Sequence, residues 1–479
     1  MSANASTLGA GWVGRARGAA AVVGAVAVCI AASYVLVDDP WFATGAVVGG
    51  AILCLLLLRP KLLLGVMLAL GPFDLSFMTG GFKALLPGLG GLDMNGIRLI
   101  GVVAGLGALA VVERDMIRHA LGRYGRWYVV FLVFAGATLV FTPARVDGVR
   151  LLFKLAYPFM VFVAVLTLAR SREELERLTD WALYGAIAIA LVLNPIYVLA
   201  GGYEVDIAGR VRVHGVGAHE NPFSFYLLVM TLIAFTRYSV RGQLRYLVLC
   251  GVFGIWMALT LTRITLLAGM AGLGGAALYA ALVARNTRAV VAAGIIGGSL
   301  ATVLIPVALE RSLGYIPTAS ELWRLLTDPT AFWESVNWQG RQIIWPVLFR
   351  TFLASPIVGN GLGASTLFLI EAFQGAMGGV IHNEYLRLLI ETGLVGSALF
   401  AIAILVWLGG VLQAGRHDDP LAREFAMPAF ASIVAWVFIA ATDNAFDYYA
   451  PFTQYIGFLC ACALAAAAMS PPARQQQDT

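Results

Sequence analysis

Charged residues are scarce in this chain of 479 residues. Asp, Glu, Lys and Arg make up 12% of it, about half of the roughly 25% found in soluble proteins. This polar fraction is too small to coat a water-soluble globule of this size, so the composition excludes an ordinary soluble domain. The five cysteines all lie inside apolar runs, where we expect small core residues, and no Cys/His spacing typical of zinc occurs. They are Cys29, Cys54, Cys250, Cys460 and Cys462.

Apolar residues dominate instead, at 60% of the chain. They fall in blocks of about 17–22 residues, the length that crosses a bilayer core of roughly 30 Å. Backbone groups in lipid must satisfy their own hydrogen bonds, so helices are expected, and the alternating pattern of a β-barrel is absent. The sequence therefore predicts an all-α integral membrane protein with about 12–14 transmembrane helices in a single polytopic domain, 1–479. The helices are expected near 18–37, 42–58, 62–77, 95–113, 127–143, 149–168, 180–200, 222–236, 245–262, 264–284, 289–308, 393–413, 425–441 and 452–470.

Arginine and lysine predict the orientation of these helices. Basic residues flank the apolar blocks at every second connection, which is the positive-inside pattern and predicts that both termini are cytoplasmic. The net charge of +5 is spread over these short flanks and forms no basic stripe, so we expect no nucleic-acid partner. A signal peptide is an alternative for the N-terminus, but the first apolar run is long and we interpret it as a retained helix. The basic flanks are Arg15/Arg17, Arg59/Lys61, Arg114/Arg118/Arg123/Arg126, Arg170/Arg172/Arg177, Arg237/Arg241/Arg245, Arg285/Arg288, Arg416/Arg423 and Arg474.

Two outward connections differ from the other, short ones. Residues 201–221 are polar and rich in glycine. Residues 309–392 form a single long connection, in which tryptophans stand among apolar and charged residues. This mixture suits helices that lie in the membrane interface or cap the bundle. We expect 309–392 to be a periplasmic loop that covers a functional site, because a long loop without a function is unusual.

The first candidate segment lies in the 201–221 connection. It reads Arg210-Val-Arg212-Val-His214-Gly215-Val-Gly217-Ala-His219-Glu220-Asn221-Pro222. Arginines bind phosphate oxygens in pairs of hydrogen bonds, and glycines let backbone amides approach a ligand. Asn-Pro then begins a helix whose N-terminus also favours anions. The alternative is an ordinary polar loop between two helices.

Two more segments carry ionisable groups on the same side. Arg263 lies in the connection Thr260–Thr265, where it binds a ligand or simply anchors the helix by reaching the interface. His382 opens the segment His382–Gly393, which also holds Tyr385 and Arg387. Histidine is suited to proton transfer near neutral pH, although a lone histidine is more often structural, and both interpretations are open.

Together these segments predict a site for a lipid diphosphate, with cations that stabilise the leaving group. A dense carboxylate cluster that would hold Mg²⁺ or Mn²⁺ is absent from the sequence, so we expect no metal and no cofactor. The nearest acidic candidates are Asp38, Asp39, Asp443 and Asp447, which are also explained by their polar loops.

The same segments resemble the O-antigen ligase and O-antigen or exopolysaccharide polymerase superfamily. The resemblance covers about 210–400 and rests on the ordered set of motifs rather than on any one of them. A longer spacer before Asn221-Pro222, Phe223 in place of the usual Asn and Thr262 in place of the usual Ser depart from the family pattern. The matching runs are Arg212-Val-His214-Gly215, Asn221-Pro222, Thr262-Arg263, Gly340-Arg341 to Trp345, Ser355-Pro356 to Gly363, His382-Asn383-Glu384-Tyr385-Leu386 and Glu391 to Gly396.

The resemblance implies a GT-C-like membrane glycosyltransferase of the bacterial inner membrane. Such an enzyme transfers a glycan from undecaprenyl diphosphate to a sugar hydroxyl at the periplasmic face, without a metal. Attack from the face opposite the leaving diphosphate would invert the anomeric centre. By position, Arg212 and Arg263 would bind the diphosphate and His382 would be the catalytic base. Further substrate-binding candidates are Arg210, His219, Asn221, Arg341, Tyr385 and Arg387.

The acceptor stays open at this level. The number of helices and the long loop favour a polymerase, which joins one lipid-linked repeat to another. The alternative is an O-antigen ligase that transfers the glycan to lipid A core. A transporter of lipid-linked glycans would show inverted repeats and broken helices in matching halves, and the sequence has neither. A purely structural membrane protein would not explain three ionisable motifs on one side.

Overall fold

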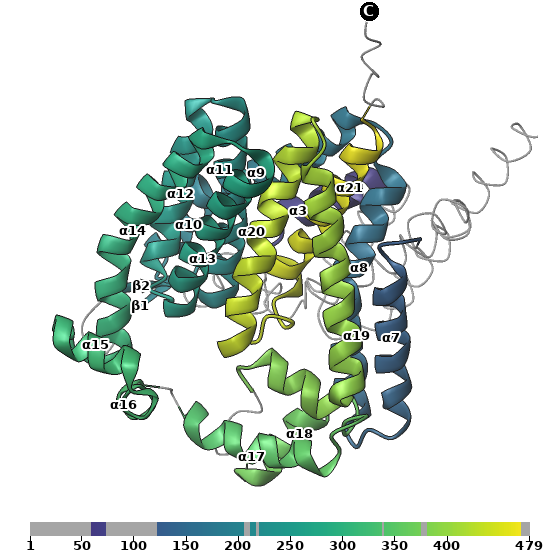
Figure 1. Ribbon diagram of the computed structural model, residues 1–479, viewed down its shortest axis with the longest axis vertical. Helices are drawn as coiled ribbons and strands as arrows, with labels where there is room; N and C mark the ends of the chain where they lie inside the picture. Colours follow the sequence, from purple (N-terminus) through teal and green to yellow (C-terminus); the bar gives the residue numbers. More distant parts are fainter. Residues whose placement is uncertain are drawn as a thin grey trace, which may run out of the picture.

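The computed structural model describes residues 59–72, 122–205, 211–216, 220–337, 340–374 and 381–470, and these are mostly helical (Figure 1). Within them, seven helical segments are long and apolar enough to cross a bilayer, and four shorter apolar helices accompany them. The protein is therefore an integral membrane protein with several spans. The predicted helices 18–37, 42–58 and 95–113 lie outside the described residues, so the predicted total of 12–14 stays a prediction. The seven segments are Arg145–Leu168, Arg172–Leu199, Glu220–Arg241, Arg263–Ala284, Glu384–Gly415, Pro420–Thr442 and Tyr449–Ala468.

Each predicted helix in the described part of the chain overlaps an observed one, but several predicted ends are wrong. The helix predicted at 62–77 ends at Ala69, and that predicted at 180–200 already begins at Arg172. Ser171 caps this early start by accepting a hydrogen bond from the Glu174 amide, so polar residues extend the helix beyond its apolar block. The bundle consists of α3 (Pro60–Ala69), α7 (Arg126–Ala137), α8 (Arg145–Leu168), α9 (Arg172–Ala188), α10 (Asn194–Leu199), α11 (Glu220–Arg241), α12 (Leu244–Leu259), α13 (Arg263–Tyr279), α14 (Thr287–Leu313), α19 (Glu384–Gly415), α20 (Pro420–Thr442) and α21 (Gln454–Ala468). One 3-10 turn, Thr138–Val140, and three π-helical turns, Ile189–Leu193, Ala280–Ala284 and Tyr449–Thr453, extend some of them.

The centre of the bundle is formed by α11, α20 and α21. In α11 and in the segment that ends with α21, 89% of the most apolar stretch is buried inside the protein. The corresponding share is 33% in α19 and 39% in Arg172–Leu199, whose outer faces carry exposed apolar side chains such as Leu199. Exposed leucine and valine on outer helices suit contact with lipid tails, since hydrocarbon is as apolar as these side chains.

One end of the bundle carries elements that do not span it (Figure 1). A short antiparallel hairpin pairs β1 (Tyr203–Val205) with β2 (Val211–Val213), with Glu204 opposite Arg212. The sequence predicted only a polar loop there, because each strand is three residues long. Four helices follow α14 at the same end: α15 (Ala319–Thr327), α16 (Pro329–Ser335), α17 (Arg341–Ala354) and α18 (Ala364–Ala372).

The predicted loop 309–392 is thus shorter than expected and largely helical. Helix α14 continues to Leu313, and α19 already begins at Glu384, with Asn383 as its cap. Helix α15 is capped by Thr318 and Glu321, which bond to each other's backbone amides. Trp323 on α15 is 69% exposed, which is consistent with a helix at the membrane interface.

A kink at Gly393 divides α19 into two parts. Gly393 has φ 63° and ψ −168°, a combination that is open essentially to glycine alone. The kink frees backbone groups that bind the loop before α18: Leu394 donates to the Pro356 carbonyl at 2.8 Å, and Gly361 donates to the Glu391 carbonyl at 3.0 Å. The part of α19 before Gly393 therefore runs in a different direction from the rest of the helix. It fixes the position of the residues that follow His382.

Candidate functional site

A cavity of about 670 Å³ lies between the hairpin, the ends of α11, α13 and α14, and the helices α15 to α17. Its lining includes Arg212, Asn221, Arg263, Arg341 and His382, so three segments far apart in the sequence meet here. Leu, Ile, Val and Phe side chains from α13 to α16 form a second, apolar wall. The cavity thus combines a cationic side with an apolar side.

Arg212 is held by carboxylates. Its guanidinium forms ion pairs with Glu204, at 3.3 Å, and with Glu220, and its Nε donates to the Thr260 carbonyl at 3.2 Å. The Glu220 side chain is 2% exposed, whereas that of Arg212 is 19% exposed. The cation is therefore the member of this pair that is more accessible from the cavity.

His214 shares the same carboxylate. Its Nδ1 lies 3.1 Å from Glu220 Oε2. This hydrogen bond raises the pKa of His214 above its ordinary value of 6.5, and it outweighs burial and the charge of Arg212, which act in the opposite direction. The protonated form of His214 is consequently stabilised beside the cavity.

Arg263 begins α13 and contacts the long connection. Its Nη1 lies 3.4 Å from the carbonyl of Asn337 and 3.5 Å from Ser312 Oγ. Thr262, which precedes it, is buried and in an extended conformation, and Leu261 has φ 51°. A positive φ is unusual for leucine, and strained backbone often occurs beside functional sites.

Arg341 reaches the cavity from the start of α17. Its Nη2 donates to the Thr442 carbonyl at 3.1 Å, which ties α17 to the end of α20. Burial lowers the pKa of Arg341 from its ordinary value, while the nearby carboxylate of Asp443 opposes this shift. An arginine stays charged at neutral pH despite such a shift, so Arg341 adds a partly buried cation to the cavity.

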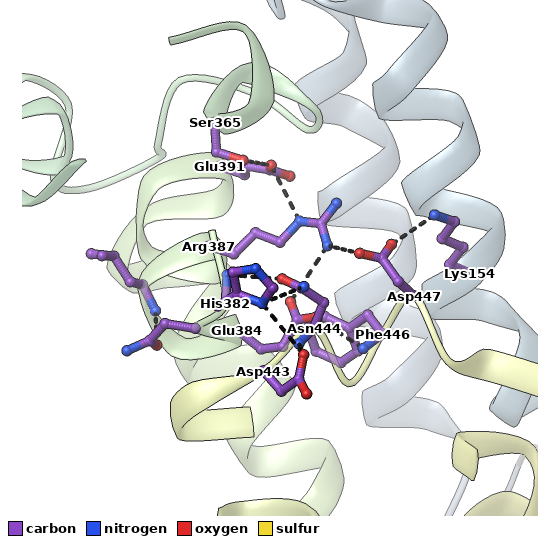
Figure 2. A network of polar contacts seen from close by, with 12 residues as sticks. Lys154, Ser365, His382, Glu384, Arg387, Glu391, Asp443, Asn444, Phe446 and Asp447 are labelled. Carbon is purple, nitrogen blue, oxygen red and sulfur yellow. Dashed lines mark hydrogen bonds and ion pairs between the residues drawn. The ribbon is translucent and has the colours of Figure 1, made fainter. Parts of the chain in front are cut away.

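His382 lies between the start of α19 and the end of α20 (Figure 2). Its backbone amide donates to Asn444 Oδ1 at 2.9 Å, and its Nδ1 lies 3.0 Å from Asn444 Nδ2 and 3.4 Å from Asp443 Oδ1. His382 has φ 53°, which is the second positive φ of a non-glycine residue in the cavity lining. The neighbouring segment 443–444 thus determines where the imidazole points.

Asp443 connects the histidine to the first motif. Its Oδ1 accepts hydrogen bonds from the Asn444 amide, at 2.8 Å, and from the Tyr448 hydroxyl, at 3.2 Å, and its Oδ2 accepts one from Asn221 at 2.7 Å. Burial and the adjacent carboxylates Asp443 and Asp447 raise the pKa of Tyr448 far above its ordinary value, so the hydroxyl keeps its proton as a donor. Asn221 and His382 are thereby joined through one carboxylate.

The other predicted site residues lie elsewhere. Tyr385 does not line the cavity, and its hydroxyl donates to the Val437 carbonyl at 2.8 Å. Arg387 lies in a separate ionic network with Asp447, Glu384 and Glu391 (Figure 2). Arg210 and His219 lie outside the described residues.

Sequence reasoning missed the roles of Glu220, Asp443 and Asn444. Glu220 was recognised only as part of a polar segment, and Asp443 only as a weak metal candidate. In the part of the chain that the structure describes, no three His, Cys, Asp or Glu side chains form a group that could hold a metal ion. A usable signal existed in Asp443-Asn444, two adjacent polar residues directly after an apolar helix, but nothing in the sequence links them to His382.

The arrangement can bind an anion next to an apolar chain. Arg212, Arg263 and Arg341 converge on one side, and the two carboxylates in the lining, Glu220 and Asp443, are the more deeply buried groups. Guanidinium groups fit phosphate oxygens well, and fixed cations stabilise charge that develops on a leaving group. The imidazole of His382, held from one side, is placed to accept or donate a proton.

Fold and cavity together define a polytopic membrane protein with an arginine- and histidine-lined site at one end of its helical bundle. No protein-family model matches the chain. The chain is similar to the exopolysaccharide production protein ExoQ of Rhizobium meliloti (strain 1021), with 24% identity over 327 residues, covering 63% of this chain and 69% of ExoQ. This distant similarity is consistent with the resemblance to the O-antigen ligase and polymerase superfamily.

Proposed function

We propose that the protein is a membrane glycosyltransferase of polysaccharide biosynthesis. It transfers a glycan from undecaprenyl diphosphate to a sugar hydroxyl at the periplasmic face of the bacterial inner membrane and thereby polymerises exopolysaccharide or O-antigen repeat units. The observation that carries this proposal is the single cavity that unites three arginines and a histidine with an apolar wall. The similarity to an exopolysaccharide production protein also supports a role in polysaccharide biosynthesis.

In this proposal the donor lies across the two sides of the cavity. Arg212, Arg263 and Arg341 bind the diphosphate, and the leucine-rich wall from α13 to α16 contacts the first part of the polyprenyl chain. The guanidiniums neutralise the charge that grows on the diphosphate as it leaves, so the residues of the site supply the stabilisation themselves.

His382 acts on the acceptor. In this proposal Nδ1 carries a proton and donates it to Asp443 Oδ1, 3.4 Å away, which leaves the lone pair of Nε2 to take the proton of the acceptor hydroxyl. The acceptor oxygen attacks the anomeric carbon, the bond from that carbon to the phosphate oxygen breaks, and polyprenyl diphosphate leaves with the electron pair. Because attack and departure occur on opposite faces of the sugar, the anomeric centre inverts. Asp443 and Asn444 keep the ring oriented.

The test uses the purified protein in detergent, with an undecaprenyl-diphosphate oligosaccharide as sole substrate and EDTA present. A ladder of lengthened lipid-linked products, with inverted linkages by NMR, is expected. Transfer that appears only after lipid A core is added would instead identify the ligase alternative. Absence of transfer to either acceptor would contradict the proposed function.

The variant His382→Asn tests the proposed role of His382 as the catalytic base. Loss of a general base typically lowers the rate by about 10²–10⁴, while donor binding and the melting temperature should stay near those of the wild type. His417→Asn replaces an exposed histidine in the connection between α19 and α20 and serves as control. Equal activity of both variants would refute the role of His382.

A further inference from the structure

A second cavity of about 220 Å³ lies beside the first one. Its polar lining comes from α8, α18, the start of α19 and the connection after α20, and includes Arg150, Lys154, Thr366, Arg387, Asn444 and Asp447. The proposed donor site does not use this cavity, whose lining carries as many Asp, Glu, Lys and Arg side chains as that of the first cavity in a smaller space.

The two cavities share their dividing wall. Ile381 lines the second cavity and His382 lines the first. In the same way, Asn444 lines the second cavity and Asp443 lines the first. Two pairs of consecutive residues therefore separate the cavities, and the side-chain Nδ2 of Asn444 lies 3.0 Å from His382 Nδ1. A ligand in the second cavity would lie directly against the group that orients the histidine.

Three charged groups of the second cavity hold one another in place. Lys154 Nζ lies 2.6 Å from Asp447 Oδ1, and Arg387 Nη1 lies 3.3 Å from Asp447 Oδ2 (Figure 2). Arg387 is further held by Glu384 and Glu391, each at 3.6 Å. Although burial raises the pKa of Asp447, the cations Arg387 and Lys154 keep it below the ordinary value, so the carboxylate stays charged.

This array suits a sugar better than a phosphate. The lining holds cations and carboxylates together, so it offers both donors and acceptors, as the neighbouring hydroxyls of a sugar ring require. A diphosphate would meet the carboxylates of Asp147 and Asp447 as well as the cations. The volume is also below the roughly 300–1,000 Å³ of drug-sized ligand sites, which favours a ligand of about one sugar ring.

We propose that the second cavity binds a sugar of the acceptor glycan, the one next to the sugar whose hydroxyl receives the transferred chain. Asn444, Asp447, Lys154 and Arg387 hydrogen-bond this sugar, and the reacting sugar extends from it past the dividing wall to the imidazole of His382 in the first cavity. The inference rests on the proposed glycosyltransferase function and adds the acceptor subsite to it. Arg387 is then a binding residue of the acceptor rather than of the donor diphosphate.

The test measures binding and transfer separately. The probe is the oligosaccharide released by mild acid from the lipid-linked repeat of the native host, labelled with a fluorophore at its reducing end. Thr366→Trp fills the second cavity without removing a charge. Lys154→Met removes one hydrogen-bond donor from the cavity, while the ion pair between Asp447 and Arg387 remains. Ile370→Trp places the same bulk on an exposed position of α18 that lines neither cavity.

The wild type and Ile370→Trp should bind the probe, with the dissociation constant raised at least fivefold in Thr366→Trp and in Lys154→Met. In transfer assays the same two variants should raise the KM for the acceptor and leave the KM for the donor within twofold. Binding that is absent in the wild type, or unchanged in both variants, overturns the inference. Probe binding without glycan transfer by the wild type would contradict the proposed function and leave the sugar site standing.

Discussion

Arg212 and Arg245 carry the same charge but have different surroundings. Arg212 forms an ion pair with Glu220, whose side chain is 2% exposed, whereas Arg245, in the first turn of α12, is exposed. A buried carboxylate that loses a cation is costly, because little solvent replaces the lost partner. His214 would still contact Glu220 without Arg212, so the loss should be smaller than for a buried pair with no other partner.

We therefore expect Arg212→Ala to lower both stability and activity, and Arg245→Ala to leave both near those of the wild type. The loss of stability for Arg212→Ala should be at most about 3–5 kcal/mol, the range measured for broken buried ion pairs. Thermal unfolding in detergent and the transfer assay measure the two effects. Equal melting temperatures of the two variants would contradict this distinction.

His214 makes the hairpin region sensitive to pH. Its pKa is raised in the folded protein, so protonation favours the folded state. The stabilisation is complete below the ordinary pKa of 6.5 and is lost as the pH rises through the raised value. The difference in melting temperature between the wild type and His214→Gln should thus be largest below pH 6.5 and shrink above it. A difference that grows with pH would show that the sign of this argument is wrong.

At the scale of elements, α19 determines the shape of the site. The run from Ser355 to Gly363, which contributes to the family resemblance, packs against the kink of this helix. A Cβ atom on Gly359 would lie 2.6 Å from the Gly393 nitrogen, and one on Gly361 would lie 2.6 Å from Thr142 Cβ. These glycines are explained by close backbone contact and do not line the first cavity.

Gly393→Ala should consequently destabilise the protein strongly. The new Cβ atom would lie 2.3 Å from the Ile357 carbonyl oxygen, in a backbone conformation that costs other residues about 1–3 kcal/mol even without a clash. Gly409→Ala, later in the same helix, meets no atom within 4 Å and should stabilise the helix by up to about 1 kcal/mol. Thermal unfolding of both variants tests whether the kink requires a glycine at position 393. Similar melting temperatures would contradict this requirement.

At the scale of the whole molecule, the proposed function requires the site to face the periplasm. Helices α15 to α18 and the hairpin lie at one end, and the connection between α19 and α20 lies at the opposite end of the bundle (Figure 1). The positive-inside pattern predicts that the α19–α20 connection is cytoplasmic.

Single cysteines in a cysteine-free background can test this orientation. In intact spheroplasts, a membrane-impermeant maleimide should label Ser320→Cys on α15, because that position is exposed and predicted to be periplasmic. His417→Cys, exposed in the α19–α20 connection, should be labelled only after permeabilisation. The reverse pattern would place the cavity in the cytoplasm and exclude a periplasmic transferase.

The sequence predicted the helices well where apolar blocks alone define them, and poorly at their ends. Ser171 caps a polar turn that extends α9 beyond its apolar block, so the predicted start of α9 was late. The start predicted at 393 coincides with the kink at Gly393, which separates the apolar part of α19 from the polar part that Asn383 caps. Among the site residues, Arg212, Asn221, Arg263, Arg341 and His382 do line one cavity, whereas Tyr385 and Arg387 do not. Helical spacing after His382 could not distinguish these, because the backbone turns at φ 53° before the helix begins.

The sequence by itself determined that the protein lies in a membrane, because 60% apolar residues in blocks of bilayer length leave no other solvent for them. It also determined which ionisable groups are available on the predicted outer side. Only the tertiary structure decided which of them share a cavity. Asn221, His382 and Asp443 are far apart in the chain, and hydrogen bonds between different helices bring them together. Contacts of this kind depend on how helices pack in space, which local residue patterns do not encode.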